Sequence, residues 1–425
     1  MKKSFCLLLT LSVAIFFGLS ACGGGGGGIP IKVSYWGDAK EIEIIDSIVK
    51  PWDKAHKEIS IILEHTPSNR YQDKVLAQIA GGEAPDVMFC GTAVFINLFR
   101  KNAFLPINDL LAGDTNVSLK DFYPESVEQY TVNGKTYALP RDIAPIACIY
   151  INKNLFDSEG LPYPTDDWTT DDLLALAKKL TKKDSAGIVS QYGFSPGWFW
   201  PNFVFDFGTG WVDNVKKPTR FVLSSAGDKA GLKFYHDLMW VHGVSPKPGS
   251  TDQTGSDLFM TGRTAMYSSG IWETPQFRTI TAFDWDVVMF PKTPGGKRGF
   301  MGGGSGYGIY SGTKHPKEAW EVVKCLAGDA GQIIGAESGL AQPAKMSLAR
   351  GEHFSLDGQK PLNKKMLDKA VQYTVGDVLS GSFYEIQSSI LFPSLDEYFL
   401  NKLSLEDTLL KIDNEIKNKG LKLQD

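Results

Sequence analysis

Residues 31–90 decide the fold, and they read IKVSYWGDAKEIEIIDSIVKPWDKAHKEISIILEHTPSNRYQDKVLAQIAGGEAPDVMFC. Short β-branched runs alternate there with longer segments whose apolar residues recur at the spacing of one helical face. The pattern predicts strand, helix, strand, helix, strand at Ile31 to Tyr35, Glu41 to Lys54, Ile59 to Glu64, Tyr71 to Ile79 and Val87 to Cys90. Such an alternation predicts an α/β fold with a mainly parallel, doubly wound sheet flanked by helices.

Ligands of doubly wound sheets bind in a crevice beyond the carboxyl ends of the strands. In this stretch, the residues that follow the predicted strand ends are Trp36, Asp38, Asn69, Arg70, Gly91 and Thr92. We expect these residues to line a ligand crevice. For Trp36 the alternative is a ring that caps the core.

The rest of the chain continues the α/β pattern. Further helices and strands are predicted at Asp171 to Leu180, Ser225 to Val241, Thr264 to Tyr267 and Trp285 to Phe290, with a charged amphipathic helix at Ser404 to Lys419. The chain has 425 residues. That is more than one hydrophobic core usually serves, so two domains of about 150 to 200 residues are expected.

The N-terminus has the pattern of an export signal. Lys2 and Lys3 precede the apolar run from Leu7 to Leu19, which is too short to span a bilayer. Residues 19–22, LSAC, resemble a bacterial lipobox, and six glycines follow at 23–28. We therefore expect a signal peptide at 1–21 and a lipidated Cys22 with a glycine tether at 22–28, which anchor the protein to the extracytoplasmic face of the cell membrane, periplasmic or outer. The alternative is an ordinary secretory signal.

Composition narrows the possible partners. The 44 basic and 48 acidic residues give a net charge of -4 without a basic cluster, which argues against nucleic acid. Cys90, Cys148 and Cys325 are too few and scattered for a disulfide framework, so buried thiols are expected. The histidines lack ligand spacing, so no metal site is inferred. Aromatic residues make up 12%, with 10 Trp and 15 Tyr, which suits stacking against rings.

Several short motifs occur in a fixed order behind the export signal: Ala84 to Val87, Asn133 to Pro140, Tyr150 to Phe156, Leu258 to Met266 and Gly339 to Ala344. In this order and spacing the chain resembles a family-1 extracellular solute-binding protein of an ABC importer, in the carbohydrate-binding group that includes maltose-binding proteins. The resemblance covers essentially the whole mature chain.

The resemblance implies a two-lobe periplasmic-binding-protein fold with a hinge that the chain crosses more than once. By analogy, the N-terminal lobe would contain 29–141 with 295–343, and the C-terminal lobe 145–291 with 348–425. Crossings are expected near Arg141 to Pro145, Pro291 to Gly296 and Pro343 to Ser347.

The implied ligand is a sugar or oligosaccharide, which needs flat aromatic faces and hydrogen-bonding groups. Trp198 and Trp200 lie in a segment where three successive aromatics among turn residues cannot all enter one core. They form either a stacking platform or a hydrophobic plug. Trp272 lies at a strand end where the family usually offers a tryptophan to a sugar, and Trp211 is a further candidate.

Polar candidates come from the first crossing and from a glycine-rich run. Asp142 and its neighbour Arg141 either bind the ligand or form a salt bridge that positions the hinge. The run at 302–308, GGGSGYG, fits neither dinucleotide nor Walker patterns. Gly303, Gly304 and Tyr307 are expected where backbone approaches a ligand closely. The alternative is a flexible strand connection.

The prediction is therefore an extracytoplasmic solute-binding lipoprotein, monomeric and without cofactor, that delivers a sugar to the permease subunits of an ABC transporter. A receptor that presents its closed form to a sensor kinase or chemoreceptor is an alternative. A glycoside hydrolase is another, because Glu273 adjoins Trp272 while Asp284 and Asp286 flank Trp285. Hydrolysis needs two opposed carboxylates, and no pair stands out.

Overall fold

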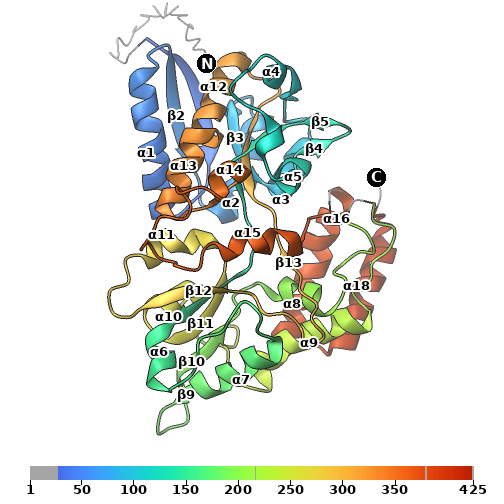
Figure 1. Cartoon of the computed structure of the whole chain (residues 1–425). Helices are drawn as coiled ribbons and strands as arrows, with labels where there is room; N and C mark the ends of the chain where they lie inside the picture. Colours follow the sequence, from blue (N-terminus) through green and yellow to red (C-terminus); the bar gives the residue numbers. More distant parts are fainter. Residues whose placement is uncertain (1–26, 216, 379–380, 424–425) are drawn as a thin grey trace, which may run out of the picture.

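The structure, a computed structural model, describes residues 27–215, 217–378 and 381–423 as two lobes, each built on a five-stranded sheet (Figure 1). The predicted signal peptide at 1–21, Cys22 and the first tether glycines lie outside the described residues. The strand order is β2-β1-β3-β14-β6 in the N-terminal lobe and β12-β8-β11-β10-β9 in the C-terminal lobe. The predicted two-lobe α/β fold is confirmed.

The N-terminal sheet is mainly parallel. Strand β1 (Ile29–Tyr35) pairs in parallel with β2 (Ile59–His65) and β3 (Val87–Gly91). Strand β14 (Ser305–Ile309) is antiparallel to β3 and to β6 (Ala138–Pro140). Alternate side chains of β3 enter two separate apolar clusters, one on each face. Both faces are therefore covered, as expected for parallel strands.

Helices cover the two faces of this sheet. Helices α1 (Ala39–Ala55) and α12 (Pro316–Ala327) pack on one face with α13 (Asp329–Ser338) beside them. Helices α2 (Ser68–Ala80) and α3 (Thr92–Phe99) pack on the other. Doubly wound packing is thus present, and α1 runs through Pro51 to end about one turn later.

Smaller elements complete the N-terminal lobe: α4 (Asn108–Ala112), η1 (Leu119–Asp121), α5 (Pro124–Glu128) and a hairpin of β4 (Thr131–Val132) with β5 (Lys135–Thr136). Asn133 and Gly134 join the hairpin with φ values of 50° and 75°. A two-residue hairpin turn of this kind needs left-handed backbone at both positions, which Asn and Gly adopt at low cost.

The C-terminal sheet is mixed. Strand β8 (Cys148–Asn152) runs antiparallel to β11 (Thr264–Ser269) and β12 (Trp285–Met289). Strand β10 (Val189–Ser195) is parallel to β11, and the short β9 (Lys182–Lys183) lies at the edge. Three of its five strands therefore share one direction.

One apolar cluster joins this sheet to its helices. The helices are α6 (Lys153–Ser158), α7 (Thr170–Leu180), α8 (Trp200–Phe207), α9 (Ala226–Trp240), α10 (Gly255–Met260), η2 (Ile271–Glu273), α11 (Thr274–Phe277), α15 (Met366–Ala370), η3 (Val371–Tyr373), α16 (Gly381–Ile386), η4 (Gln387–Leu391), α17 (Phe392–Phe399) and α18 (Leu405–Lys419). The last four lie beside α8 and α9 (Figure 1). The charged helix predicted at Ser404 to Lys419 is present as α18.

The chain passes between the lobes after β6, after β12 and after α13. The connecting segments form two small sheets and a short helix: β7 (Asp142–Ile143) with β15 (Gln342–Pro343), β13 (Phe300–Met301) with β16 (Thr374–Val375), and α14 (Met346–Ala349). Strands β8 and β14, the first after a passage, run antiparallel to their neighbours. Each of these two strands enters its sheet at the edge where the parallel strands end, so it must run in the opposite direction. The carboxyl ends of the parallel strands in the two lobes therefore face each other.

Candidate functional site

A cavity of about 740 Å³ lies where the strand ends of the two sheets face each other. Its volume is in the range of small-molecule sites, roughly 300–1,000 Å³. Residues of both lobes and of the connecting segments line it. Nine of the predicted ligand residues are among them: Trp36, Asp38, Gly91, Thr92, Asp142, Trp198, Trp272, Gly303 and Gly304. Their contact with a ligand remains a prediction.

Trp36 and Asp38 follow strand β1 and lie on the N-terminal wall of the cavity. The Trp36 ring packs against Tyr71, with 4.8 Å between centroids, and against Phe89, with 4.3 Å. It therefore rests on the core and lines the cavity at once. Asp38 is the N-cap of α1, where its Oδ1 accepts the Glu41 N–H at 2.8 Å. The cap fixes this carboxylate at the mouth of the cavity.

Arg141 connects the carboxylates of the N-terminal wall. Its Nη1 donates to Glu41 Oε1 at 2.9 Å, its Nε donates to Asp142 Oδ2 at 2.8 Å, and its guanidinium lies 4.5 Å from the Phe89 ring centre. Burial alone would lower the pKa of Arg141, but the two carboxylates raise it above its usual value. Burial raises the pKa of Glu41, and Arg141 opposes that rise. The predicted salt bridge at the hinge is present, and both of its partners line the cavity.

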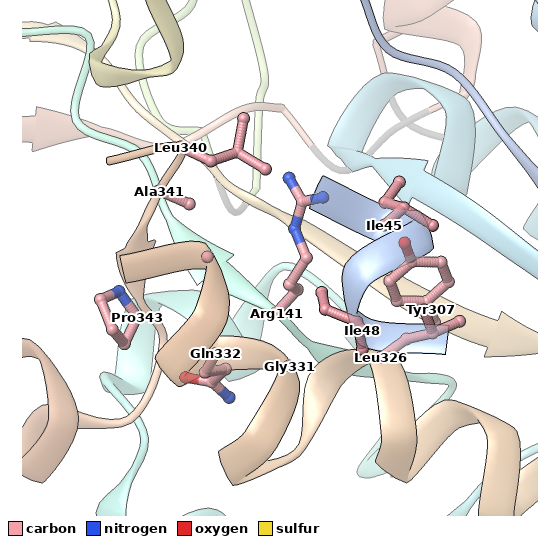
Figure 2. A pocket seen from close by; sticks show the side chains of 11 residues that line it. Ile45, Ile48, Arg141, Tyr307, Leu326, Gly331, Gln332, Leu340, Ala341 and Pro343 are labelled. Atoms are coloured by element: carbon pink, nitrogen blue, oxygen red, sulfur yellow. The ribbon is translucent and has the colours of Figure 1, made fainter. Parts of the chain in front are cut away.

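Behind the cavity, Arg141 also borders a small void of about 10 Å³. Figure 2 shows its side chain between Ile45, Ile48 and Tyr307 on one side and Leu340 and Ala341 on the other. These surroundings are apolar, so the guanidinium depends on its two carboxylates for compensation.

The glycine-rich run lines the cavity at 302–304 and then becomes β14. Gly304 has φ of 150°, and a Cβ there would lie 2.3 Å from the Asp142 carbonyl oxygen. A Cβ on Gly302 would lie 1.6 Å from the Thr374 methyl carbon. The glycines therefore allow three connecting segments to approach each other, a reason that the sequence interpretation missed. The Ser305 N–H donates to Asp142 Oδ1 at 2.8 Å and locks the arrangement.

The C-terminal wall presents aromatic faces. Trp198 follows β10 and keeps 56% of its surface exposed, although its ring packs on Phe199 with 4.4 Å between centroids. Trp272 lies in η2 after β11, half-buried. A Cβ on Gly270 would lie 1.9 Å from the Trp272 ring, so the ring lies flat on this glycine. Both tryptophans line the cavity opposite Trp36.

The sequence interpretation missed Asp377, which also lines the cavity. Burial raises its pKa to about 6, and a hydrogen bond from Thr92 in the opposite lobe opposes the rise. Thr92 Oγ1 lies 2.9 Å from Gln129 Oε1, so the three side chains form a chain of polar contacts. The pairing of β13 with β16 places the segment just before Asp377 beside residues 300–301. No motif around it could have revealed this.

Five predicted ligand residues do not line the cavity, and three of them are aromatic residues of the core. Trp200 and Trp211 are 7% and 3% exposed and pack edge to face in the C-terminal core. Tyr307, 1% exposed, lies under Phe89 in the core of the other lobe. Trp200 is in α8, whereas Tyr307 is in β14 with its side chain on the face that α1 and α12 cover. The structure therefore places these three rings in the cores of the lobes and not in the cavity lining.

Asn69 and Arg70 are exposed in the first turn of α2. The preceding Pro67 and Ser68 line the cavity, but Asn69 and Arg70 do not. Their helical conformation turns them away from the strand end on which the prediction placed them.

The carboxylates considered for hydrolysis lie elsewhere. Burial raises the pKa of Glu273, and hydrogen bonds from Ser256, Ser269 and Tyr267 oppose the rise. Asp284 is 2.7 Å from Lys153 Nζ, and the Asp286 carboxylate accepts the Asn363 N–H. Glu273, Asp284 and Asp286 therefore each make local contacts, and none of them lines the cavity.

Among the described residues, no helix is long and apolar enough to cross a membrane, and no group of three or more His, Cys, Asp or Glu side chains is placed to hold a metal ion. Cys90, Cys148 and Cys325 are buried free thiols, as predicted.

Comparisons with known proteins cover most of the chain. The sequence model described as bacterial extracellular solute-binding protein matches residues 38–333. The maltodextrin-binding protein MdxE of Bacillus subtilis is 26% identical over 353 residues, which covers 78% of each chain. An uncharacterised ABC transporter extracellular-binding protein of Pyrococcus horikoshii is 25% identical over 340 residues, 75% of this chain and 74% of that protein.

Solved structures share the fold. An ABC substrate-binding protein of Listeria monocytogenes in complex with cycloalternan superposes with a TM-score of 0.83 at 22% identity, covering 93% of this chain and 100% of that one. The maltodextrin-binding domain MalE of Bdellovibrio bacteriovorus, bound to maltotriose, gives 0.77 at 16% identity, covering 92% and 100%. At these identities the likeness establishes the architecture.

Proposed function

The chain belongs to the bacterial extracellular solute-binding proteins, and from that membership we propose that its cavity captures a neutral sugar or oligosaccharide for an ABC transporter. The observation that carries the proposal is that two tryptophans of one lobe, Trp198 and Trp272, line the same cavity as Trp36 of the other lobe and two carboxylates, Asp38 and Asp377. In the described part of the chain neither carboxylate has an ion-pair partner. The sugar-bound relatives support the same ligand class.

Carbohydrate chemistry fits this arrangement. A sugar ring offers apolar C–H faces that stack on tryptophan and hydroxyls that donate to carboxylates. Hydrogen bonds to charged groups contribute roughly 1.5–3 kcal/mol each, and a micromolar complex needs about 8 kcal/mol. Two stacking rings and the free oxygens of Asp38 and Asp377 reach that range without a charged ligand.

Binding closes the lobes in this proposal. The hinge consists of the segments near Arg141 to Pro145, Pro291 to Gly296 and Pro343 to Ser347, between lobes 29–141 with 295–343 and 145–291 with 348–425. A ligand drives closure only if it binds the closed form more tightly. Trp36 and Trp272 lie on opposite lobes, so a ligand that touches both gains contacts in the closed form alone.

Calorimetry with a panel of oligosaccharides tests the ligand class, and small-angle scattering tests closure. We expect at least one neutral sugar to bind and to contract the protein. Incubation should leave the oligosaccharide intact, because the proposal includes no turnover. Binding of polyamines or glycerol phosphodiesters, with no sugar bound, would refute the proposal.

Anchoring through a lipid on Cys22 is part of the proposed role, since a tethered binder stays near its permease. The lipobox at 19–22 and the glycines at 23–28 support it. Cys22→Ser should abolish acylation and processing, so that the protein no longer partitions into detergent at its mature size. Partitioning of that variant at the mature size would place the anchor elsewhere. Light scattering of the soluble form should give a monomer.

A further inference from the structure

The lining of the cavity has an excess of negative charge. In the described part of the chain it contains four carboxylates, one guanidinium and one imidazole, those of Asp38, Glu41, Asp142, Asp377, Arg141 and His65. Arg141 already pairs with two of the carboxylates, since its Nη1 is 2.9 Å from Glu41 Oε1 and its Nε is 2.8 Å from Asp142 Oδ2. His65 Nε2 lies 2.9 Å from the Gly37 carbonyl oxygen and donates to it. The positive charge of this lining is therefore already compensated by the protein itself.

Helix N-termini attract anions, and two of those at the cavity lie beside a carboxylate of the protein. Asp38 caps α1, where its Oδ1 accepts the Glu41 N–H at 2.8 Å. Helix α3 begins at Thr92, whose hydroxyl is hydrogen-bonded to Asp377. A third helix, α2, begins at Ser68, which lines the cavity without a side-chain cap before it. An acidic group of a ligand would therefore meet a carboxylate at two of these three helix ends.

The carboxylates of the N-terminal wall already repel one another. Burial raises the pKa of Glu41, Arg141 opposes that rise, and the charges of Asp142 and Asp38 add to it. A further negative charge in the cavity would add to this repulsion without bringing a counter-charge. It would also lose its own hydration, which is costly for an ion that finds no partner.

We propose that Asp38 and Asp377 determine specificity by charge, because they exclude acidic saccharides such as uronates and sugar phosphates while a neutral saccharide of the same shape binds. The inference rests on the proposed sugar-binding function and adds the residues that set its ligand class. A neutral sugar donates its hydroxyls to both carboxylates. A uronate replaces one of these donors with a carboxylate, so like charges face each other, which strongly disfavours binding. Asp377 is half-buried and Asp38 is exposed, so water screens Asp377 less and its effect is the larger.

Calorimetry at pH 7.5 and constant ionic strength tests the proposal with matched sugars. Maltotriose, cellotriose and mannotriose are each compared with the same trisaccharide carrying one C6 carboxylate in place of the hydroxyl. We expect the acidic member of a pair to bind at least about 100-fold more weakly than the neutral member. Equal affinities within a pair would overturn the inference and indicate that the open end of α2 compensates the added charge. Absence of binding by both members of every pair would instead refute the proposed function, on which the inference rests.

Variants separate charge from the loss of a hydroxyl. Asp377→Asn should raise the affinity for the acidic sugar relative to the neutral one by about tenfold. Asp38→Asn should raise it less, and it keeps the helix cap because Asn caps as well as Asp does. Asp73→Asn is the matched control: it makes the same change in net charge at an exposed residue of α2 outside the cavity lining, and should leave the ratio unchanged. A ratio that stays at the wild-type value in all three variants would overturn the proposal.

A pH series gives a readout that a purely structural role of Asp377 would not change. Burial raises the pKa of Asp377 to about 6, so its carboxyl is mostly neutral at pH 5 and ionised at pH 7.5, whereas a sugar carboxylate stays ionised at both. The wild type should therefore discriminate less at pH 5, and Asp377→Asn should not change with pH. Tyr130 also interacts with Asp377, but burial raises its pKa well above the usual value, so it stays neutral. The same pH effect in both proteins would assign it to another group of the lining, such as His65, and would refute the role of Asp377.

Discussion

The two walls of the cavity differ in how far their side chains are already paired or packed before a ligand binds. On the N-terminal wall, Glu41 and Asp142 both pair with Arg141, and Trp36 rests on Phe89. On the C-terminal wall, Trp198 leaves 56% of its surface to solvent. The first wall is preorganised, which limits the entropy lost on binding. The second has apolar surface that a ligand can remove from water.

The same contrast occurs within one short segment. Trp198 and Trp200 are two residues apart, yet the first lines the cavity and the second is 7% exposed in the core. Helix α8 begins at Trp200, and its first turn directs that ring towards Trp211 and Phe399. Local backbone geometry, rather than residue type, separates a binding ring from a structural one.

The largest expected effect comes from breaking the preorganised wall. Arg141→Met should lower the free energy of unfolding by about 3–5 kcal/mol, because it leaves Glu41 and Asp142 as buried charges without their cation. Urea unfolding followed by circular dichroism measures this loss. Arg70→Met, at an exposed site, is the control and should change stability by less than about 0.5 kcal/mol. Similar small losses in both variants would show that the Arg141 network contributes little to folding.

Trp200→Ala should also destabilise strongly, by about 3–5 kcal/mol, because it opens a cavity among packed aromatic rings. The folded fraction should bind sugar with unchanged affinity, as measured by calorimetry under conditions where the variant is folded. A large affinity loss together with unchanged stability would restore Trp200 as a ligand residue.

Trp198→Ala should show the reverse behaviour. The exposed ring contributes little to folding, but its loss should weaken sugar binding by about 2 kcal/mol, by analogy with aromatic anchors at interfaces. Calorimetry gives the affinity and thermal unfolding gives the stability. If the variant binds sugar as well as wild type does, the C-terminal wall works through Trp272 alone or the site lies elsewhere.

The smallest expected effect concerns Asp377 and pH. Its carboxyl takes up a proton near pH 6 in the folded protein, compared with 3.8 as the ordinary value. Between these two pH values the folded state binds more protons than the unfolded state. The contribution of this carboxyl to the free energy of unfolding is therefore lost as the pH rises from about 4 to 6. Asp377→Asn should be more stable than wild type at pH 7.5, on the order of 1 kcal/mol after allowance for its partial exposure. The difference should vanish near pH 4 in thermal unfolding profiles, and a difference independent of pH would contradict the assignment.

Much of the fold was predictable because local patterns and tertiary packing agree. The first strand was predicted at Ile31 to Tyr35 and is Ile29–Tyr35, and the helix predicted at Ser404 to Lys419 is Leu405–Lys419. Clear periodicity and a serine cap fixed these elements locally. The antiparallel directions of β8 and β14 were not predictable, because they depend on where the chain enters each sheet.

By itself, the sequence determined that strand ends would carry Trp36, Asp38, Gly91 and Thr92 to a crevice, since the direction of parallel strands places their carboxyl ends on one edge. It also identified Trp198 and Trp272 as aromatic residues in turns. Only the tertiary structure decided that Trp200, Trp211 and Tyr307 are core residues and that Asp377 lies beside Thr92 in the cavity lining. Burial and contacts between distant segments depend on how whole elements pack, and local spacing carries no record of that packing.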